Sequence, residues 1–589
     1  MLDARLYRAA FLPLLFVLLV VAFSLGERPR PIGTTFSPDT FLGDRALATL
    51  DQLAKQFPER RPGSAADRQM ADVIAAELRR SVPGTVELDN FQARTVDGKR
   101  ELTNVVATRL GQPGPGIVVV AHRDAIGRGA RAELTGTAAL LELARVAGSG
   151  RLQRTITFIS TSGGSGGFEG ATRAVKELDG NVDAVIVLGA IGAQATYRPM
   201  VVGTSNGLGQ APLQLQRTVQ QAIERQSGVS PGAPRAFIQG LRMAAPMTTG
   251  EQGPFLRAGL PAVLVSATGE RAAPVDGQVS LRRLERFGRA VLGALYALDN
   301  GPDISGQGPT DELVLRGKVV PSWAMRLLVL ALLLPPLVTS IDAMARLRRR
   351  REPVAPWLAW ALSPALPLIA CCITAILLSV TGLVSASPGA PMPPGAIDFS
   401  GALVAAVLVL VIVAVLAWLG LRPPLLRAVG LSPEIRPDRL GAGVAAGMLV
   451  PIFAVILWVP NPYAAGAMVP AAHLWLWATA PETGLRRLPS AALALGGLVL
   501  PVVVIAVLSQ IFGLSVIQTP WFWILLVAGG HMPWWAWMLW SGFIAAAVTT
   551  AIVISRRSEH VDANPITVRG PHTYAGPGSL GGTGSAIRR

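Results

Sequence analysis

Apolar residues gather in two parts of this 589-residue chain, and their distribution constrains the fold more than any other feature. Residues 10–26 form one apolar block, and apolar runs dominate residues 323–555. Helices of about 20 apolar residues are long enough to cross a bilayer. We therefore expect an integral membrane protein with four parts: a signal-anchor span at 1–26, a globular domain at 27–320, a transmembrane bundle at 321–557 and a disordered tail at 558–589.

The apolar runs predict eight spans, near 10–26, 323–345, 357–384, 401–421, 440–460, 464–481, 489–511 and 534–555. Basic residues occupy alternate loops: Arg346 and Arg348 to Arg351, then Arg422, Arg427, Arg436 and Arg439, then Arg486 and Arg487, then Arg556 and Arg557. The loops between them, 385–400, 461–463 and 511–533, contain neither Lys nor Arg. The stretch from Pro520 to Met532 is apolar but too short to cross, so we expect it to be interfacial or re-entrant.

Basic loops remain on the cytoplasmic side of a membrane, so we expect the domain at 27–320 outside the cytoplasm and both termini inside. The same clusters account for the formal net charge of +16, so a membrane lipid, and no nucleic acid, is the expected partner. The Ala-, Arg- and Leu-rich composition is typical of a high-GC bacterium and favours a bacterial plasma membrane.

The domain at 27–320 alternates helix-like and strand-like segments. Buried β runs such as Ile117 to Val120 and Ala184 to Val187 are each followed by a helical pattern. This alternation predicts a doubly wound α/β sheet covered on both faces. Ligands of such sheets bind at the carboxyl ends of the strands, which here lead into the loops 121–134, 161–168, 189–196 and 248–254.

Several segments of the domain together resemble one known family. In order they are Arg61-Pro62-Gly63-Ser64, Asn104-Val105-Val106-Ala107, Ala121-His122-Arg123-Asp124, Thr135-Gly136-Thr137-Ala138 and Gly253-Pro254-Phe255-Leu256. Their order and spacing resemble the di-zinc aminopeptidases, which share the zinc exopeptidase fold with glutaminyl cyclase. The resemblance implies a mixed α/β sheet. The layout of one span, an outer domain and a bundle is similar to that of the GPI-transamidase attachment subunit and an endoplasmic-reticulum metallopeptidase.

The resemblance also implies where a metal site would lie. Family members hold two zinc ions with five ligands, and the corresponding positions here are His122, Ala132, Ser165, Gly189 and Gln252. The general base of the family corresponds to Gly164, and Asp124 corresponds to the carboxylate that orients the first ligand. Catalytic zinc needs about three protein ligands, so we expect no zinc cofactor. An improvised site of His122 with Glu133 and Glu251 is the alternative.

Two further site hypotheses concern the same loops. Arg123, Arg128 and Arg131 surround His122 in the sequence and predict an anion site for a lipid head group, a carboxylate or an envelope phosphate; solvated surface arginines are the alternative. Gly163 to Gly167 form a G-x-S-x-G motif between a strand and a helix. A relay of Ser165, His122 and Asp124 is therefore a second candidate site, with a structural relic as its alternative.

These patterns favour a non-hydrolytic, membrane-embedded relative of the aminopeptidases that acts as a binding or scaffolding subunit, with other membrane subunits or a peptide or envelope ligand as partners. The alternative is an active peptidase or hydrolase that uses the improvised metal site or the serine relay. Transport through the C-terminal spans is a third possibility. It is disfavoured because those spans contain almost no charged residue at mid-depth.

Overall fold

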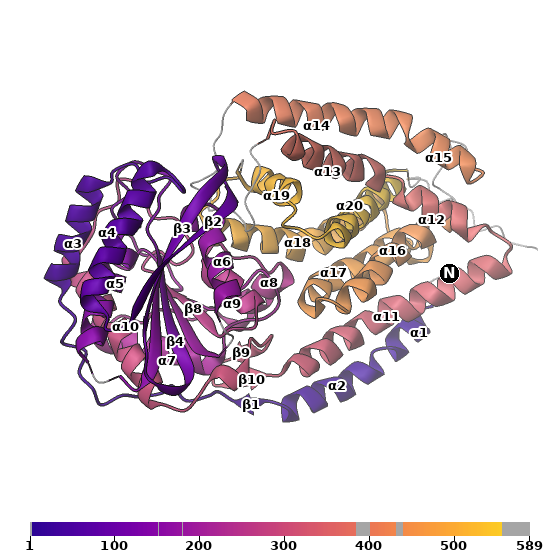
Figure 1. The fold of residues 1–589 in the computed structure, drawn as a ribbon. Coiled ribbons are helices and arrows are strands. Elements are labelled where there is room, and N and C mark those ends of the chain that lie inside the picture. Colours follow the sequence, from indigo (N-terminus) through magenta and orange to yellow (C-terminus); the bar gives the residue numbers. More distant parts are fainter. Residues whose placement is uncertain are drawn as a thin grey trace, which may run out of the picture.

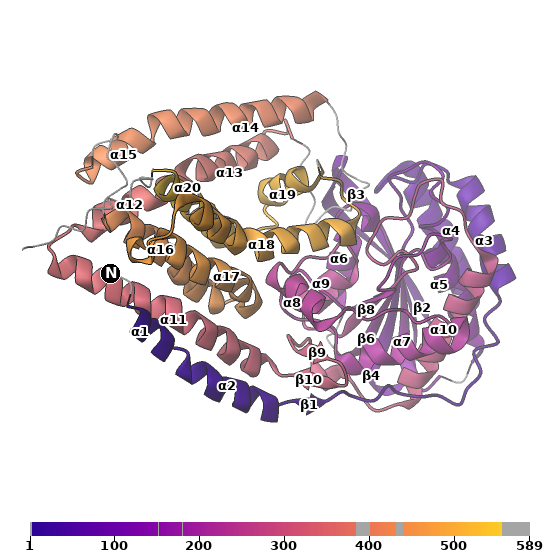
Figure 2. The ribbon, with the colours of Figure 1, turned by 180° about the vertical axis from the view of Figure 1, so that it is seen from behind.

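The computed structural model describes residues 3–150, 152–178, 181–384, 401–431, 440–516 and 518–556. A sheet-based domain lies beside a group of apolar helices (Figure 1), and the view from behind gives the same arrangement (Figure 2). The predicted disordered tail at 558–589, the loop at 385–400 and the basic residues Arg436, Arg439 and Arg557 lie outside the described residues.

A seven-stranded sheet forms the centre of the domain, with the strand order β2-β3-β5-β4-β6-β8-β7. Strands β5, β4, β6 and β8 are parallel, whereas β2, β3 and β7 pair antiparallel with their neighbours. The bounds are β2 (Thr85–Thr95), β3 (Gly98–Arg109), β4 (Gln112–His122), β5 (Arg154–Thr161), β6 (Val182–Leu188), β7 (Val201–Val202) and β8 (Ala262–Val265). The predicted mixed α/β class is confirmed.

Helices cover both faces of this sheet, because its central strands bury side chains on both sides. Every residue of β6 is buried, as are Ile117 to Val120 of β4. In Figure 1, α4 and α5 lie on the face away from the apolar helices, and α6 and α9 lie on the face toward them. The helices are α3 (Gly43–Gln56), α4 (Ala65–Ser81), α5 (Thr135–Ser149), η1 (Gly164–Gly166), α6 (Glu169–Glu177), α7 (Leu213–Ser227), α8 (Ala236–Ala244), α9 (Gln252–Arg257), α10 (Leu281–Asn300) and η2 (Ser305–Gln307).

A small second sheet joins the points where the chain enters and leaves the domain. Its strands, in the order β1-β10-β9, are β1 (Gly26–Glu27), β10 (Lys318–Val320) and β9 (Leu313–Leu315). Strand β1 follows α1 (Ala4–Ala9) and α2 (Leu12–Phe23), and β10 precedes α11 (Ser322–Arg349). Helices α1 and α2 pack against α11. The domain is therefore inserted between two packed apolar helices.

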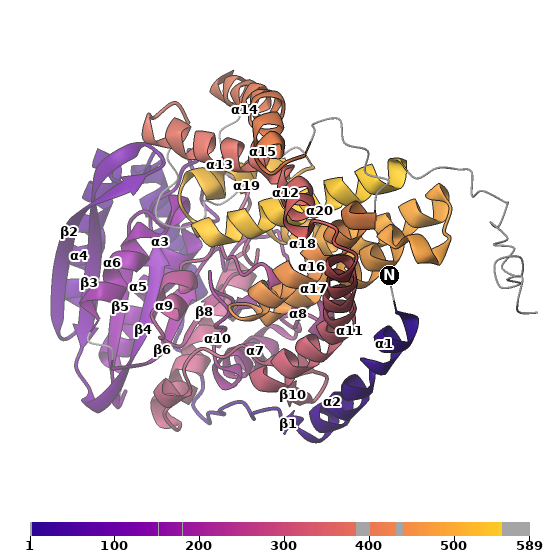
Figure 3. The same cartoon turned by 90° about the vertical axis from the view of Figure 1, so that its right-hand side faces the viewer.

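Among the described residues, six helices are long and apolar enough to cross a membrane: Ala4–Phe23, Ser322–Arg349, Leu403–Ala428, Gly441–Trp458, Arg487–Phe512 and Trp534–Ser555. Helices α12 (Val354–Leu362) and α13 (Ala365–Val380) add a seventh if they are counted as one span, bent by 45° at the break. Pro364 lies at that break, and the residue before a proline is disfavoured in helical conformation. Figure 3 presents the bundle from its side. These long apolar helices support a membrane protein.

The remaining elements of the bundle are α12 (Val354–Leu362), α13 (Ala365–Val380), α14 (Gly401–Gly420), α15 (Arg422–Ala428), α16 (Leu440–Trp458), α17 (Pro462–Thr479), η4 (Pro481–Thr483), α18 (Arg487–Phe512), α19 (Gln518–Ala528) and α20 (Trp534–Ser555). The short apolar stretch predicted at Pro520 to Met532 overlaps α19, which has 11 residues. A helix of this length cannot cross a bilayer of about 30 Å.

The predicted span near 464–481 coincides with α17, which does not qualify as a span by length and hydropathy among the described helices. It packs along α16 and also contacts α11, α18 and α20. At its start, the Asn461 side chain donates a hydrogen bond to the Met243 carbonyl of α8 at 2.9 Å. Neighbouring helices bury most of α17, from Tyr463 to Thr479. A helix enclosed in this way does not need an apolar surface toward lipid, so its composition alone does not determine whether it crosses.

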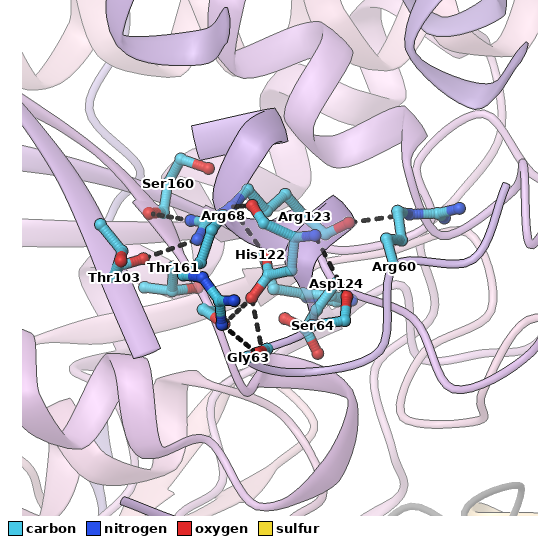
Figure 4. Close-up of polar contacts among 12 residues, drawn as sticks. Arg60, Gly63, Ser64, Arg68, Thr103, His122, Arg123, Asp124, Ser160 and Thr161 are labelled. Atoms are coloured by element: carbon cyan, nitrogen blue, oxygen red, sulfur yellow. Dashed lines mark hydrogen bonds and ion pairs between the residues drawn. The ribbon is translucent and has the colours of Figure 1, made fainter. Parts of the chain in front are cut away.

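Arg123 is a fully buried charge at the end of β4 (Figure 4). Its Nε atom lies 2.9 Å from Oδ1 of Asp67 in α4, and both side chains are 0% exposed. Its Nη1 donates to the Ser160 carbonyl of β5 at 3.1 Å, and its Nη2 donates to the Thr103 carbonyl of β3 at 2.7 Å. A buried charge is tolerated only when it is paired and hydrogen-bonded, so this network ties one helix and two strands to the end of β4.

We predict that Arg123→Met lowers the free energy of unfolding by about 3–5 kcal/mol, because it leaves the Asp67 carboxylate buried without its counter-ion. Arg128→Met is the matched control. Arg128 is 78% exposed and pairs with the exposed Glu59, so its replacement should change stability by no more than about 0.5 kcal/mol. Thermal unfolding of the purified protein in detergent measures both. Equal shifts for the two variants would contradict a structural role for Arg123.

The orientation of the bundle is a separate prediction, made from the positions of the arginines. Reporters fused after residues 352, 430 or 487 should be cytoplasmic, and reporters within 27–320 should be external. Fusions at 390 and 560, outside the described residues, should be external and cytoplasmic respectively. An external reporter after residue 487 would exclude α17 as a span.

Candidate functional site

The four parallel strands end at one edge of the sheet, where a pocket of about 120 Å³ opens. Its wall includes His122 at the end of β4, Ser165 after β5, Gly189 after β6 and Ser266 after β8. This is the edge at which sheets of this class bind ligands. Residues of all four predicted strand-end loops line this pocket, together with the segment 264–275, which the sequence prediction did not include.

His122 points at Glu251, whose position does not correspond to any of the five zinc ligands of the family. Its Nδ1 lies 3.3 Å from Oε2 of Glu251, whose side chain is 2% exposed. The other oxygen of Glu251 accepts a hydrogen bond from the Thr161 hydroxyl at 2.6 Å. Burial lowers the pKa of His122, but the hydrogen bond and the charge of Glu251, with Asp124 and Glu133 nearby, outweigh it and raise the pKa to about 9. His122 and Glu251 therefore form an ion pair at neutral pH.

Asp124 holds the glycine-rich loop instead of orienting His122. Its two carboxylate oxygens accept hydrogen bonds from the backbone N–H groups of Gly164 and Ser165, each at 3.0 Å. The Ser165 hydroxyl also donates to Asp124. Gly163 adopts a φ of 82°, which glycine tolerates, at the start of this turn.

The three members of the predicted serine relay are thus close together, but their hydrogen bonds follow a different order. A relay places the imidazole between the serine hydroxyl and the carboxylate. In the described structure, Ser165 bonds directly to Asp124, and His122 bonds to Glu251. The imidazole therefore does not lie between the hydroxyl and the carboxylate in the described structure.

The residues at the positions of the other zinc ligands pack against their neighbours or form hydrogen bonds with them. Ala132 is fully buried in an apolar cluster with Ala190, Ala193, Ala267 and Ala273. A Cβ added at Gly189 would lie 3.0 Å from Cβ of Ser266. The Gln252 amide donates to the Thr204 carbonyl at 3.1 Å and to the Thr248 hydroxyl at 2.8 Å. At Gly164, the position of the general base, an added Cβ would overlap Cβ of His122.

Glu133 also faces this pocket, as the improvised metal site requires. Its Oε2 atom is buried and has no hydrogen-bond partner in the described part of the chain. Burial raises the pKa of Glu133, while the charges of His122 and Arg60 act in the opposite direction. Within the described ranges, no group of three or more His, Cys, Asp or Glu side chains is placed to hold a metal ion. These residues therefore do not fit a zinc site.

The three arginines of the predicted anion site do not converge. Arg123 is buried against Asp67, whereas Arg128 pairs with Glu59 and Arg131 pairs with Asp51 at the surface. Side chains of successive residues in an extended chain point to opposite sides, which separates Arg123 from His122. Each guanidinium has a carboxylate partner, so the three are not gathered around one point in this structure.

Two buried polar groups near the pocket had no signal in the sequence pattern. Arg60 donates to the carbonyls of Arg123 and Ala130 at 2.8 Å and 2.7 Å, so it fixes the loop behind the site. Arg242 of α8 pairs with Glu270 at 2.5 Å, with both side chains buried. Arg60 immediately precedes the Arg-Pro-Gly-Ser segment, but its role depends on carbonyls distant in the sequence.

Residues 104–270 match the model of Peptidase family M28. Solved structures similar to the chain include a zinc aminopeptidase from Bacillus subtilis, with 15% identity and a TM-score of 0.36 over 45% of this chain and 99% of the other. A glutaminyl cyclase from an Acidobacteriales bacterium has 17% identity and a TM-score of 0.36 over 45% of this chain and 98% of the other.

A third similar structure is the LapA aminopeptidase of Legionella pneumophila, with 14% identity and a TM-score of 0.36 over 50% of this chain and 89% of the other. No curated protein matches the sequence. The match at 104–270 falls on the strands and loops that build the pocket. Residues 104–270 are therefore similar to Peptidase family M28, in agreement with the resemblance that the sequence motifs indicated.

Proposed function

We propose that this protein is a membrane-embedded binding or scaffolding subunit at a bacterial cell envelope, whose M28 segment has lost zinc-dependent hydrolysis. The observation that supports this proposal most directly is which side chains occupy the ends of the parallel strands. Of the positions that correspond to zinc ligands, His122 alone retains a ligand side chain, and it is bonded to Glu251. Zinc hydrolysis needs about three ligands and a bound water, which these groups do not supply.

In this proposal, the positive charge of His122 balances the negative charge of Glu251, as a metal ion would at this edge of the sheet. A buried carboxylate is stable only with a compensating charge, and here a protonated imidazole supplies it. The space at Gly164 is filled by His122, and the space at Gly189 is limited by Ser266. Restoring a carboxylate at either position would require the surrounding side chains to move. This supports a site that has been repacked for stability.

The remaining pocket supports binding of a small group only. Its volume of about 120 Å³ is well below the roughly 300–1,000 Å³ of sites for drug-sized ligands. The loops around it still join the domain to the bundle: Arg271 lines the pocket and donates a hydrogen bond to the Gln510 carbonyl of α18. A scaffolding role is supported by this connection between the strand ends and the apolar helices.

We predict that the full-length protein, purified in detergent, contains no stoichiometric zinc, because one imidazole already bound to a carboxylate cannot hold the ion tightly. Elemental analysis after exposure to zinc measures this. Chelator treatment should leave the melting temperature unchanged. One or more tightly held zinc ions per chain would overturn the proposal.

A hydrolysis assay separates the proposal from the enzymatic alternative. The protein should not hydrolyse aminoacyl amide or ester substrates, and Ser165→Ala should match the parent protein. Turnover that disappears in Ser165→Ala but persists with chelator would establish the serine relay instead. Turnover that disappears with chelator would establish a metal enzyme.

The ion pair predicts a pH dependence of stability. The pKa of His122 is raised to about 9 in the folded protein, against about 6.5 in an unfolded chain. The stabilisation is therefore fully present below about pH 6.5 and is lost as the pH rises through about 9. His122→Gln and Glu251→Gln should both flatten this part of the profile of melting temperature against pH. A slope in His122→Gln as steep as in the parent protein would contradict the pair.

A further inference from the structure

A second cavity, of about 920 Å³, lies away from the strand-end pocket, on the side of the domain nearest the apolar helices. It is bordered by residues of β7, α7, α8 and β9, and by Ile511 near the end of α18. Neither the M28 resemblance nor the strand ends account for it. Its wall differs from that of the first pocket in charge.

Six arginines line this cavity, and none of its lining residues is acidic: Arg28, Arg198, Arg217, Arg235, Arg242 and Arg316. Arg242 is neutralised by Glu270, at 2.5 Å. The other five form no ion pair with any carboxylate in the described part of the chain. Unpaired like charges around one space repel each other, so an anion inside it would be strongly favoured.

Arg28, one of the five arginines without an ion pair in the described chain, is partly buried. The Arg28 Nε atom is buried and has no hydrogen-bond partner among the described residues. Burial lowers the pKa of Arg28, and the charge of Arg217 lowers it further. Buried donors are normally satisfied, so the missing acceptor at Arg28 points to a ligand.

The surrounding backbone holds the arginines in place. Arg217 donates a hydrogen bond to the Pro29 carbonyl, which ties α7 to the segment after β1. A Cβ added at Gly232 would lie 3.0 Å from Cδ of Arg198, so this loop packs closely on the Arg198 stem. Gln239, also in the wall, has both ends of its amide bonded to backbone groups at 2.7 Å and 3.0 Å. Part of the cavity wall, at Arg198, Arg217 and Gln239, is therefore supported by the surrounding chain.

The cavity lies where apolar helices end. Arg28 follows α2 and β1, and Arg316 lies in the turn between β9 and β10, just before α11 begins. Ile511 belongs to the last turn of α18. Ala4–Phe23, which comprises α1 and α2, is long and apolar enough to span a membrane, as are α11 and α18, so the ends of these helices mark the level of lipid head groups.

We propose that this arginine-lined cavity binds a phosphate group presented at the membrane surface. The planar guanidinium forms paired, charge-assisted hydrogen bonds with phosphate oxygens, which matches a wall whose charged residues are all arginines. The head group of an anionic phospholipid and a soluble phosphate ester share this chemistry. The inference does not depend on the state of the strand-end pocket or on the loss of zinc.

The test uses the full-length protein and a double variant, Arg198→Gln with Arg235→Gln. Both arginines are exposed and lack an ion pair in the described chain, so the variant should fold normally. Arg79→Gln with Arg94→Gln is the matched control, because both are also exposed arginines but lie outside the cavity. In one arm, nanodiscs of phosphatidylcholine with phosphatidylglycerol are extracted and the retained lipid is measured by native mass spectrometry. In the other arm, glycerol phosphate is titrated calorimetrically in neutral detergent.

We expect the parent protein and the control to retain phosphatidylglycerol, and the cavity variant to bind about tenfold more weakly or worse, as expected for the loss of charged hydrogen bonds. Binding should weaken with added salt. Phosphatidylglycerol binding alone identifies a lipid head group as the ligand, and binding of glycerol phosphate as well identifies the phosphate itself. Equal binding by the parent protein and the cavity variant, or equal losses in both double variants, would overturn the proposal.

Discussion

The buried ion pair of Arg123 and Asp67 is the interaction on which the strand-end edge of the domain depends. A guanidinium with no exposed surface cannot be hydrated, so its charge must be met entirely by protein groups. Asp67 and the carbonyls of Thr103 and Ser160 meet it, and they come from α4, β3 and β5. The pair fixes the chain between His122, which lines the pocket, and Asp124, which bonds to the glycine-rich turn, because alternate side chains of an extended chain face opposite ways.

The chemistry of the pocket follows from that orientation. His122 faces Glu251, and Asp124 faces the N–H groups of the glycine-rich turn, so each polar group is satisfied within the protein. Glu133 is the exception, since one of its oxygens is buried without a hydrogen-bond partner in the described chain. A small ligand with a hydrogen-bond donor could supply the partner that this Glu133 oxygen lacks.

The contact between the domain and the apolar helices is formed largely by α8, a helix that the sequence pattern did not predict. Leu241, Met243 and Ala244 of α8 are buried in the same apolar cluster as the bundle, and Asn461 bonds to the carbonyl of Met243. On its other side, α8 borders the arginine-lined cavity and supplies Arg242, which pairs with Glu270 at the strand ends. One short helix therefore joins the pocket, the cavity and the bundle.

The sequence by itself predicted most of the helices long and apolar enough to cross a membrane, the mixed α/β class and the similarity to Peptidase family M28, because these depend on apolar run length, buried strand patterns and motif order, all of which are local. It could also place His122, Ser165 and Gly189 at one edge, since strand ends of a parallel sheet meet there. Only the tertiary structure decided the partners of Arg123, Arg128 and Arg131, which lie in different directions despite their proximity in the chain. It also decided the pairing of His122 with Glu251 and the gathering of Arg28, Arg198 and Arg316 around one cavity. These contacts join residues far apart in sequence, and their geometry depends on how helices and strands pack, which no spacing pattern encodes.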